Sequence, residues 1–245
     1  MNPAFARGVL LSVRGQLRRA DSGITGQFVA AVAAGALIGI AAYASLLAAE
    51  CTGLGRFASA VVFPVGILLV VLTGANLFTG NCLSLCWCAS WKRALTLFGV
   101  SWLGNLAGAV LLAMLVQYPA IALPQAFAAM AQVKTALPWY LATAYGICCN
   151  YLVCTSVAAF MAWHSLARAW LPVFCFIICG FEHSIADMFY MAAAATAHAT
   201  AFPEYLKDVV VLLFWVTVGN VIGGGVIGLY GAMEALKEER NGKTA

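Results

Sequence analysis

Three ionisable side chains lie close together in the stretch ICGFEHSIADM, residues 178–188. Glu182, His183 and Asp187 are surrounded there by apolar residues, although only 9% of the 245 residues are charged. Imidazole gains and loses a proton near neutral pH, and carboxylates accept hydrogen bonds and protons. Because an ionisable residue deep in an apolar run is costly, this cluster predicts a site for proton transfer or for a small ion.

A second polar stretch interrupts another apolar run. TGANLFTGN, residues 73–81, contains two glycines, two asparagines and two threonines. Glycine and asparagine are typical of helix ends, and hydroxyl and amide groups supply donors and acceptors where a helix is interrupted. The two stretches are therefore expected to be matched interruptions of two helices.

The elements around these stretches are predicted to be transmembrane helices. Hydrophobic residues form 64% of the chain, and the mean hydropathy of +0.94 is far above the range of soluble domains. Five stretches lack Asp, Glu, Lys, Arg and His, and each exceeds the roughly 20 residues that a helix needs to cross the bilayer. They are residues 22–49, 57–91, 94–133, 135–163 and 209–233. Residues 169–197, which carry the ionisable cluster, form a predicted sixth span.

The basic residues predict how these spans are oriented. With six spans, ten Lys and Arg residues fall on one side of the membrane and three on the other. Such a bias marks the cytoplasmic side, so both termini are expected in the cytoplasm and the chain in the inner membrane of a bacterium. The net charge of +4 follows from this bias and does not indicate nucleic-acid binding.

The two ends of the chain are predicted to lie outside the six-span domain. Apolar residues recur every four positions near the N-terminus, at Phe5, Val9, Val13 and Leu17. This pattern predicts an amphipathic interfacial helix within residues 1–23. Residues 24–235 are expected to form the channel domain, and residues 236–245 a cytoplasmic tail.

A repeated motif indicates that the channel domain has two related halves. The pattern Gly-Asn-x-x-Gly begins at Gly104 in the third span and again at Gly219 in the sixth, 115 residues later. Because three spans per half is an odd number, the second half must be inserted upside down. We therefore predict an all-α membrane protein of two inverted three-helix repeats, about residues 24–118 and 138–235.

The second and fifth spans are predicted to be broken near the middle of the membrane. Residues 57–89 would measure about 50 Å as one helix, against a hydrocarbon core of about 30 Å. A broken helix is tolerated in a membrane where it faces a cavity or other protein. Two half-helix N-termini that face each other carry partial positive charge, so they predict a site for a small anion.

Four segments resemble the formate/nitrite transporter family in their order and spacing. They are GANLFTGN (residues 74–81), CNYLVC (149–154), GFEHSIADM (180–188) and VTVGNVIGGG (216–225). The third is the most specific, and the resemblance covers nearly the whole chain. WLGN (102–105), CNYLVC and LLFWVTVGN (212–220) look most similar to the nitrite branch of this family.

The resemblance implies an aquaporin-like homopentamer in the lipid bilayer, with one pore in each protomer for small monovalent anions or their conjugate acids, such as nitrite, formate or hydrosulfide. It implies that His183 is the central histidine, Thr79 a pore-lining threonine and Lys134 a vestibule lysine. Asn150 and Asn220 are also expected in the pore. Two apolar constrictions are expected to bracket the histidine, formed by Phe63, Ile67, Leu77, Phe78, Val153 and Phe176.

Two positions depart from the family pattern. Asn76 stands where the family often has an acidic residue, and Asp187 stands where it often has asparagine. Asn76 and Asp187 are both expected to support the helix breaks. Glu182 is expected to support the second break as an acceptor for freed backbone N–H groups, with a proton carrier as the alternative. Asp187 follows His183 by one helical turn and can face it, cap the helix or contact another subunit.

The predicted mechanism centres on the charge of the substrate. Burial disfavours the imidazolium form of His183, whereas an arriving anion favours it. We expect the anion to gain a proton at or near His183 and to cross the constriction as a neutral acid, because a bare anion would lose its hydration there. The alternatives are a hydrogen-bonded core histidine, a Thr79 that bonds its own backbone, and an exposed loop lysine at position 134.

Other classes of function fit the sequence less well. A hydrosulfide or other weak-acid channel of the same family is one alternative. An aquaporin-like channel for neutral solutes is another, although paired Asn-Pro-Ala breaks and a pore arginine are missing. The chain has no pairing of a nucleophile with a base, no nucleotide-binding loop and no cofactor motif, so neither an enzyme nor an ATP-driven pump is expected. Nine cysteines without a CxxC pair are expected to be buried thiols rather than metal ligands.

Overall fold

The computed structural model describes residues 2–21, 23–88, 90–117, 123–195 and 202–240. The helices in this part of the chain are α1 (Pro3–Ala20), α2 (Ile24–Thr52), α3 (Arg56–Val62), α4 (Val65–Thr73), α5 (Phe78–Asn81), α6 (Trp91–Val116), α7 (Pro124–Thr135), α8 (Trp139–Trp163), α9 (Leu166–Cys179), α10 (Ser184–Ala194) and α11 (Phe202–Arg240). A 3-10 helix, η1 (Cys82–Trp87), directly follows α5.

Several of these helices are long and apolar enough to cross a membrane. In the described residues there are five such spans, namely α2, the pair α3 and α4, α6, α8 and α11. Helices α9 and α10 are bent by 53° at a short break and make a sixth span if they are counted together. The prediction of an all-helical membrane protein is thereby confirmed.

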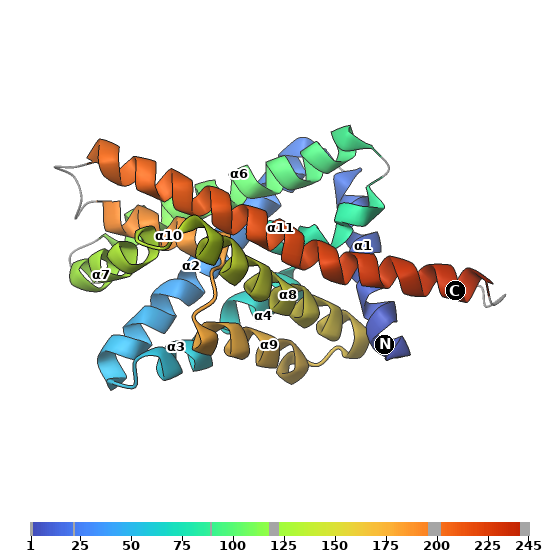
Figure 1. Ribbon diagram of the computed structural model, residues 1–245, viewed down its shortest axis with the longest axis horizontal. Coiled ribbons are helices and arrows are strands. Elements are labelled where there is room, and N and C mark those ends of the chain that lie inside the picture. The colour runs from blue at the N-terminus through green and yellow to red at the C-terminus, as the bar shows by residue number, and fades with distance from the viewer. Residues whose placement is uncertain (1, 22, 89, 118–122, 196–201, 241–245) are drawn as a thin grey trace.

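The helices are arranged between two ends of the molecule. Helix α11 runs from the end that carries α7 to the end that carries α1 (Figure 1). The start of α1 and the end of α11 lie at the same end (Figure 1), and the two helices contact each other there. We call these two ends the α1 face and the α7 face.

Helix α1 packs against the bundle. Val9 and Val13 are fully buried, and they form a cluster with Leu83 of η1 and with residues of α8 and α11. The C-terminal end of α1 is held by an ion pair of 2.6 Å between Asp21 and Arg93. The sequence predicts an amphipathic interfacial helix here, and in the structure its apolar face packs on apolar side chains of η1 and α8.

The boundaries of the predicted domains differ slightly from those of the helices. Helix α2 begins at Ile24, where the channel domain is predicted to begin. Helix α11 continues to Arg240, so the predicted tail begins inside this helix. The rest of the tail, residues 241–245, and residue 118 of the predicted first repeat lie outside the described residues.

Glycines allow two pairs of helices to approach closely. Helix α6 packs on α2, and α11 packs on α8, along the two Gly-Asn-x-x-Gly motifs. A Cβ atom at Gly108 would overlap the carbonyl oxygen of Val32, and one at Gly223 would overlap that of Ile147. Lipid provides no hydrophobic drive for helices to associate, so membrane helices rely on such close packing. The two motifs therefore make equivalent contacts in the two halves of the chain.

Replacing Gly108 with alanine is expected to destabilise the fold by about 1–3 kcal/mol, because the added methyl group meets backbone that cannot turn aside. Thermal unfolding of the purified protein in detergent measures this loss. Gly26→Ala is the matched control, since a Cβ atom there meets nothing within 4 Å. Equal melting temperatures for the two variants would contradict the contact.

Candidate functional site

The two polar stretches lie where one helix ends and the next begins. The first break, residues 74–77, separates α4 from α5, and the second break, residues 180–183, separates α9 from α10. Gly74 (φ +70°) ends α4 and Gly180 (φ +73°) ends α9. Glycine adopts this left-handed conformation without a steric penalty, so each break begins at a glycine.

Asn105 of α6 satisfies the backbone of the first break. Its Oδ1 accepts a hydrogen bond of 2.8 Å from Phe78 N, the first amide of α5. Its Nδ2 donates to Asn76 O at 3.0 Å and to Ala31 O of α2 at 2.8 Å. One fully buried amide thus pairs groups that helix geometry leaves open and that lipid cannot satisfy.

Asn220 of α11 does the same at the second break. Its Oδ1 accepts from Ser184 N, the first amide of α10, at 3.0 Å. Its Nδ2 donates to Glu182 O at 3.1 Å and to Gly146 O of α8 at 2.9 Å. The two asparagines occupy the same position in the repeated motif. In each copy the glycines contact the neighbouring helix, and the asparagine hydrogen-bonds the backbone of the break.

Three further asparagines extend this network. Asn150 Nδ2 donates to Thr79 O at 3.1 Å and to Asn220 O at 2.6 Å. Asn76 Oδ1 accepts from Asn81 Nδ2 at 2.8 Å. The sequence predicts pore positions for Asn150 and Asn220, and the structure adds that both amide groups hydrogen-bond to backbone groups of this chain.

His183 and Thr79 meet where the two breaks approach each other. Thr79 Oγ1 lies 3.2 Å from His183 Nε2, and both residues are buried. His183 is also the N-cap of α10, because its Nδ1 accepts a hydrogen bond of 3.2 Å from Ala186 N. An Nδ1 that accepts carries no proton, so the proton of the neutral ring is on Nε2 and points toward Thr79.

Aromatic and aliphatic side chains enclose this contact. The ring of Phe176 stacks on His183 at 5.9 Å, and Phe63 meets Phe176 edge to face at 5.6 Å. Ile67 and Val153 are also buried, with no more than 2% of their surface exposed. The imidazole therefore lies in an apolar environment in which a bare ion would be poorly solvated.

The other two predicted constriction residues are buried at the first break and face different ways. Leu77 lines a cavity between α1 and this break. Phe78 packs edge to face against Phe98 of α6 at 6.2 Å and lines an apolar groove between α6 and α11. Of the two, Leu77 therefore faces the α1 side of the site.

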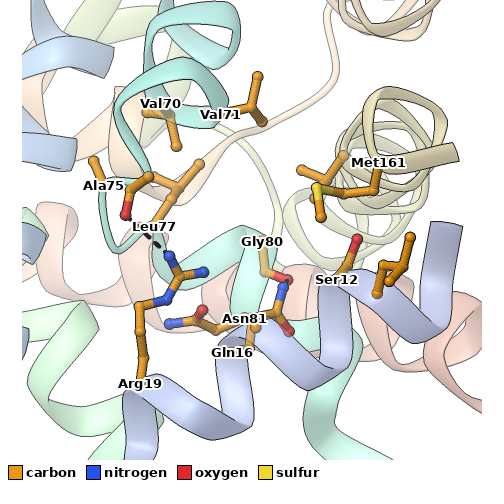
Figure 2. Close-up of a pocket in the computed structure, with 14 residues that line it drawn as sticks. Ser12, Gln16, Arg19, Val70, Val71, Ala75, Leu77, Gly80, Asn81 and Met161 are labelled. Carbon is orange, nitrogen blue, oxygen red and sulfur yellow. Dashed lines mark hydrogen bonds between the residues drawn. The ribbon is translucent and has the colours of Figure 1, made fainter. Parts of the chain in front are cut away.

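The cavity on the α1 face has a volume of about 270 Å³ (Figure 2). Arg19 and Gln16 reach into it from α1 (Figure 2). The Arg19 guanidinium donates to Gly74 O at 2.9 Å, and Gln16 Nε2 donates to Gly80 O at 2.8 Å. A cation and an amide thus line the space next to the first break; Arg19 is held by the backbone of this break and Gln16 by the backbone of α5.

A buried ionic cluster lies beside the second break, between α7 and α10. The Lys134 ammonium of α7 pairs with the carboxylates of Glu182 and Asp187, the latter at 2.7 Å. The exposed fractions of the three side chains are 11%, 7% and 0%. The ammonium also lies 5.7 Å from the ring centre of Tyr190.

This cluster bears on the alternatives for three residues. The Glu182 carboxylate pairs with Lys134, and the freed backbone N–H of Ser184 goes to Asn220. Asp187 pairs with Lys134, and the cap of α10 is His183. Lys134 is buried, because two carboxylates compensate its charge, so it is not an exposed loop lysine.

The cysteines are distributed differently from the prediction. Cys82, Cys149 and Cys154 are buried, whereas five others lie exposed on the isolated protomer, namely Cys51, Cys86, Cys148, Cys175 and Cys179. In the part of the chain that the structure describes, no group of three or more His, Cys, Asp and Glu side chains is arranged to hold a metal ion.

Comparison with known proteins places this site in a family. The model of the formate/nitrite transporter family matches residues 11–233. The chain belongs to the formate/nitrite transporter family. Its motifs at both breaks lie within the matched range, and the family consists of transporters and channels rather than enzymes.

Two relatives of this formate/nitrite transporter illustrate the family. The chain is 32% identical over 203 residues to a probable formate transporter of Methanothermobacter thermautotrophicus, covering 71% of this chain and 73% of that protein. It is 30% identical over 177 residues to the nitrite transporter NirC of Escherichia coli, covering 67% of this chain and 65% of that protein. These two identities are too similar to separate a formate from a nitrite branch.

A solved structure supports the fold of the transporter. The chain superimposes on a pentameric formate channel with formate bound, with a TM-score of 0.72 and 28% identity. The match covers 87% of this chain and 98% of that chain. The arrangement of helices is therefore that of formate/nitrite channels.

Three residues of the site are absent from the sequence-based prediction. The sequence marks Asn105 only through the repeated motif, and it marks Arg19 only through its charge. Gln16 carries no signal beyond its place in an amphipathic helix. Gln16 lies on the apolar face of α1 and is 2% exposed. A polar residue on an otherwise apolar helix face is the signal by which the sequence could have indicated it.

Proposed function

We propose that this protein is a membrane channel for small monovalent weak-acid anions such as nitrite and formate. The observation that carries this proposal is the contact between Thr79 and His183, where two half-helices begin inside an apolar enclosure. Two neutral donors and two helix N-termini favour an anion, whereas the surrounding aromatic rings favour an uncharged species. The substrates named for the relatives satisfy both demands, because each anion has a neutral conjugate acid.

The proposed architecture is six spans in two inverted repeats, with the second and fifth spans broken. The equivalent hydrogen bonds of Asn105 and Asn220 support it. Trp102 and Thr217, which are 115 positions apart, also hydrogen-bond to each other at 3.2 Å. A contact between equivalent residues is expected on a two-fold axis. The pentameric relative supports a homopentamer with one pathway in each protomer.

The proposed pathway runs from the α1 face to the α7 face. On the α1 face, Arg19 draws anions into the cavity beside Leu77 by long-range attraction. This face is cytoplasmic if the positive-inside bias holds, and the membrane is then the bacterial inner membrane. On the α7 face the approach leads past Lys134 to His183.

The proposed chemistry is proton transfer to a held anion. The Nε2–H of His183 and the hydroxyl of Thr79 donate hydrogen bonds to the anion. A proton from water on the entry side then binds to the anion and forms the neutral acid. This acid crosses the apolar constriction that Phe63 and Phe176 form. On the far side the acid returns the proton to water, so no net charge crosses the membrane.

Transport by the wild-type protein is therefore expected to be electroneutral. In proteoliposomes, nitrite or formate uptake should consume one external proton for each anion, and the initial rate should rise by up to about tenfold for each pH unit of acidification, with the concentration of weak acid. Anion flux, internal pH and membrane current are measured in the same preparation. A current equal to the anion flux would contradict the proposed chemistry, and water permeation without anion uptake would favour a neutral-solute channel.

A further inference from the structure

The ionic cluster on the α7 face has one negative charge too many. Lys134 supplies one ammonium, whereas Glu182 and Asp187, here called the acid pair, supply two carboxylates. Taking an ion out of water has a large free-energy cost even after the protein relaxes. One carboxylate is compensated by Lys134, and the second is not.

The geometry of the acid pair shows the same excess. Asp187 is fully buried, and its Oδ2 accepts no hydrogen bond from any described residue. The carboxyl groups of Glu182 and Asp187 both contact the ammonium of Lys134, so they lie close to each other. Two ionised carboxylates in one buried site repel each other, so a proton on one of them stabilises the pair.

The described residues provide no second buried Lys or Arg beside the acid pair; Arg56 of α3, whose guanidinium lies against Gly180 of the second break, is exposed. The other titratable side chains that face the acid pair are His183 at the second break, Cys149 of α8 and Tyr190 of α10. Tyr190 directs its hydroxyl to Ala42 O of α2, at 3.4 Å. Among the described residues of α2 and α11, which also pack on α10, the charged side chains near this end are exposed, namely Glu50, Glu204, Lys207 and Asp208.

The N-terminus of α10 reduces the imbalance only in part. Asp187 lies in the first turn of this helix, where the partial positive charge of the N-terminus stabilises a carboxylate modestly. This gain is smaller than the cost of burying an uncompensated carboxylate. The binding of one proton by the acid pair removes the difference.

We propose that Glu182 and Asp187 share one proton taken from water on the α7 face, and that this proton controls anion entry from that face. With the proton bound, the cluster is neutral and anions approach His183. When the proton leaves to water at higher pH, one carboxylic acid becomes a carboxylate, the cluster carries a charge of −1, and anions are repelled. The second part of this inference rests on the proposed function, whereas the first part does not.

Infrared difference spectroscopy of the full-length protein in lipid tests the proton directly. A C=O stretching band of a protonated carboxylic acid is expected near neutral pH, where exposed carboxylates show none, and it should shift in D₂O. The band should be lost in Asp187→Asn and in Glu182→Gln, each of which leaves a neutral pair with Lys134. The matched control is Glu204→Gln, which replaces an exposed carboxylate and should retain the band.

The outcomes are distinct from those for transport. The shared proton would be overturned if the wild type showed no such band or if the band persisted in both variants. Either result would hold whether or not the protein conducts anions. If the band behaves as expected, uptake from the α7 face by the wild type should fall about tenfold more than the weak-acid concentration does over the pH range in which the band disappears. Asp187→Asn should remove this additional fall and keep the dependence on weak acid, and a variant profile that equals the wild-type profile would overturn the control of entry.

Discussion

Replacing His183 with asparagine is expected to lower anion uptake by about 100-fold while the protein remains folded. The Oδ1 of asparagine is as many bonds from the backbone as the Nδ1 of histidine, so it can still accept from Ala186 N and cap α10. It does not reach Thr79, however, so the anion loses the Nε2–H donor that lies beside the Thr79 hydroxyl. A group that assists proton transfer typically contributes about 10²–10⁴ to a rate, which sets the expected loss.

Two further variants separate the roles of His183. His183→Ala loses the cap as well, so it should also destabilise the protein by about 0.5–2 kcal/mol. His164→Asn is the matched control, because His164 is exposed and has a positive φ of 47°, which asparagine tolerates. Uptake and its pH dependence are measured in proteoliposomes. Wild-type uptake with a wild-type pH profile in His183→Asn would exclude His183 from the chemistry.

Local features of the sequence were sufficient to predict where helices α4 and α9 end. Gly74 and Gly180 each stand at the end of an apolar run and are followed by polar residues, and a membrane helix that is too long must break where such groups can be satisfied. His183 is conspicuous for a similar reason, since its burial has a cost that a structural role alone rarely balances. These inferences depend on neighbours in the sequence and on the thickness of a bilayer.

Contacts between distant residues could not be predicted in the same way. Lys134 lies 48 residues from Glu182 and 53 from Asp187 in the sequence. No periodicity connects them, because α7 reaches the second break only through the packing of the bundle. The backbone hydrogen bonds of Asn150 and Asn220 were not predicted for a related reason. A buried amide can face a pore or a peptide group, and only the three-dimensional fold distinguishes the two.

The second large effect is expected when the brace of the second break is removed. Asn220→Ala leaves Ser184 N–H and Glu182 C=O buried without a partner, and each such group costs about 1–3 kcal/mol. We expect a loss of about 2–5 kcal/mol in stability, together with loss of uptake, because His183 adjoins both of these groups. Asn105→Ala should have a similar effect at the first break, where Phe78 N–H loses its acceptor.

Comparing stability with uptake separates a brace from a pore residue. If Asn220 acted mainly by contacting the anion, Asn220→Ala would lower uptake without lowering the melting temperature in detergent. Asn220→Asp keeps the acceptor for Ser184 N–H but loses both donated bonds, so its stability should lie between those of the wild type and Asn220→Ala. Thr143→Val is the control, since the Thr143 hydroxyl bonds only Trp139 O of its own helix among the described residues, and its loss should change stability by no more than about 0.5 kcal/mol. A fully stable Asn220→Ala variant would show that water or substrate, rather than this side chain, satisfies the second break.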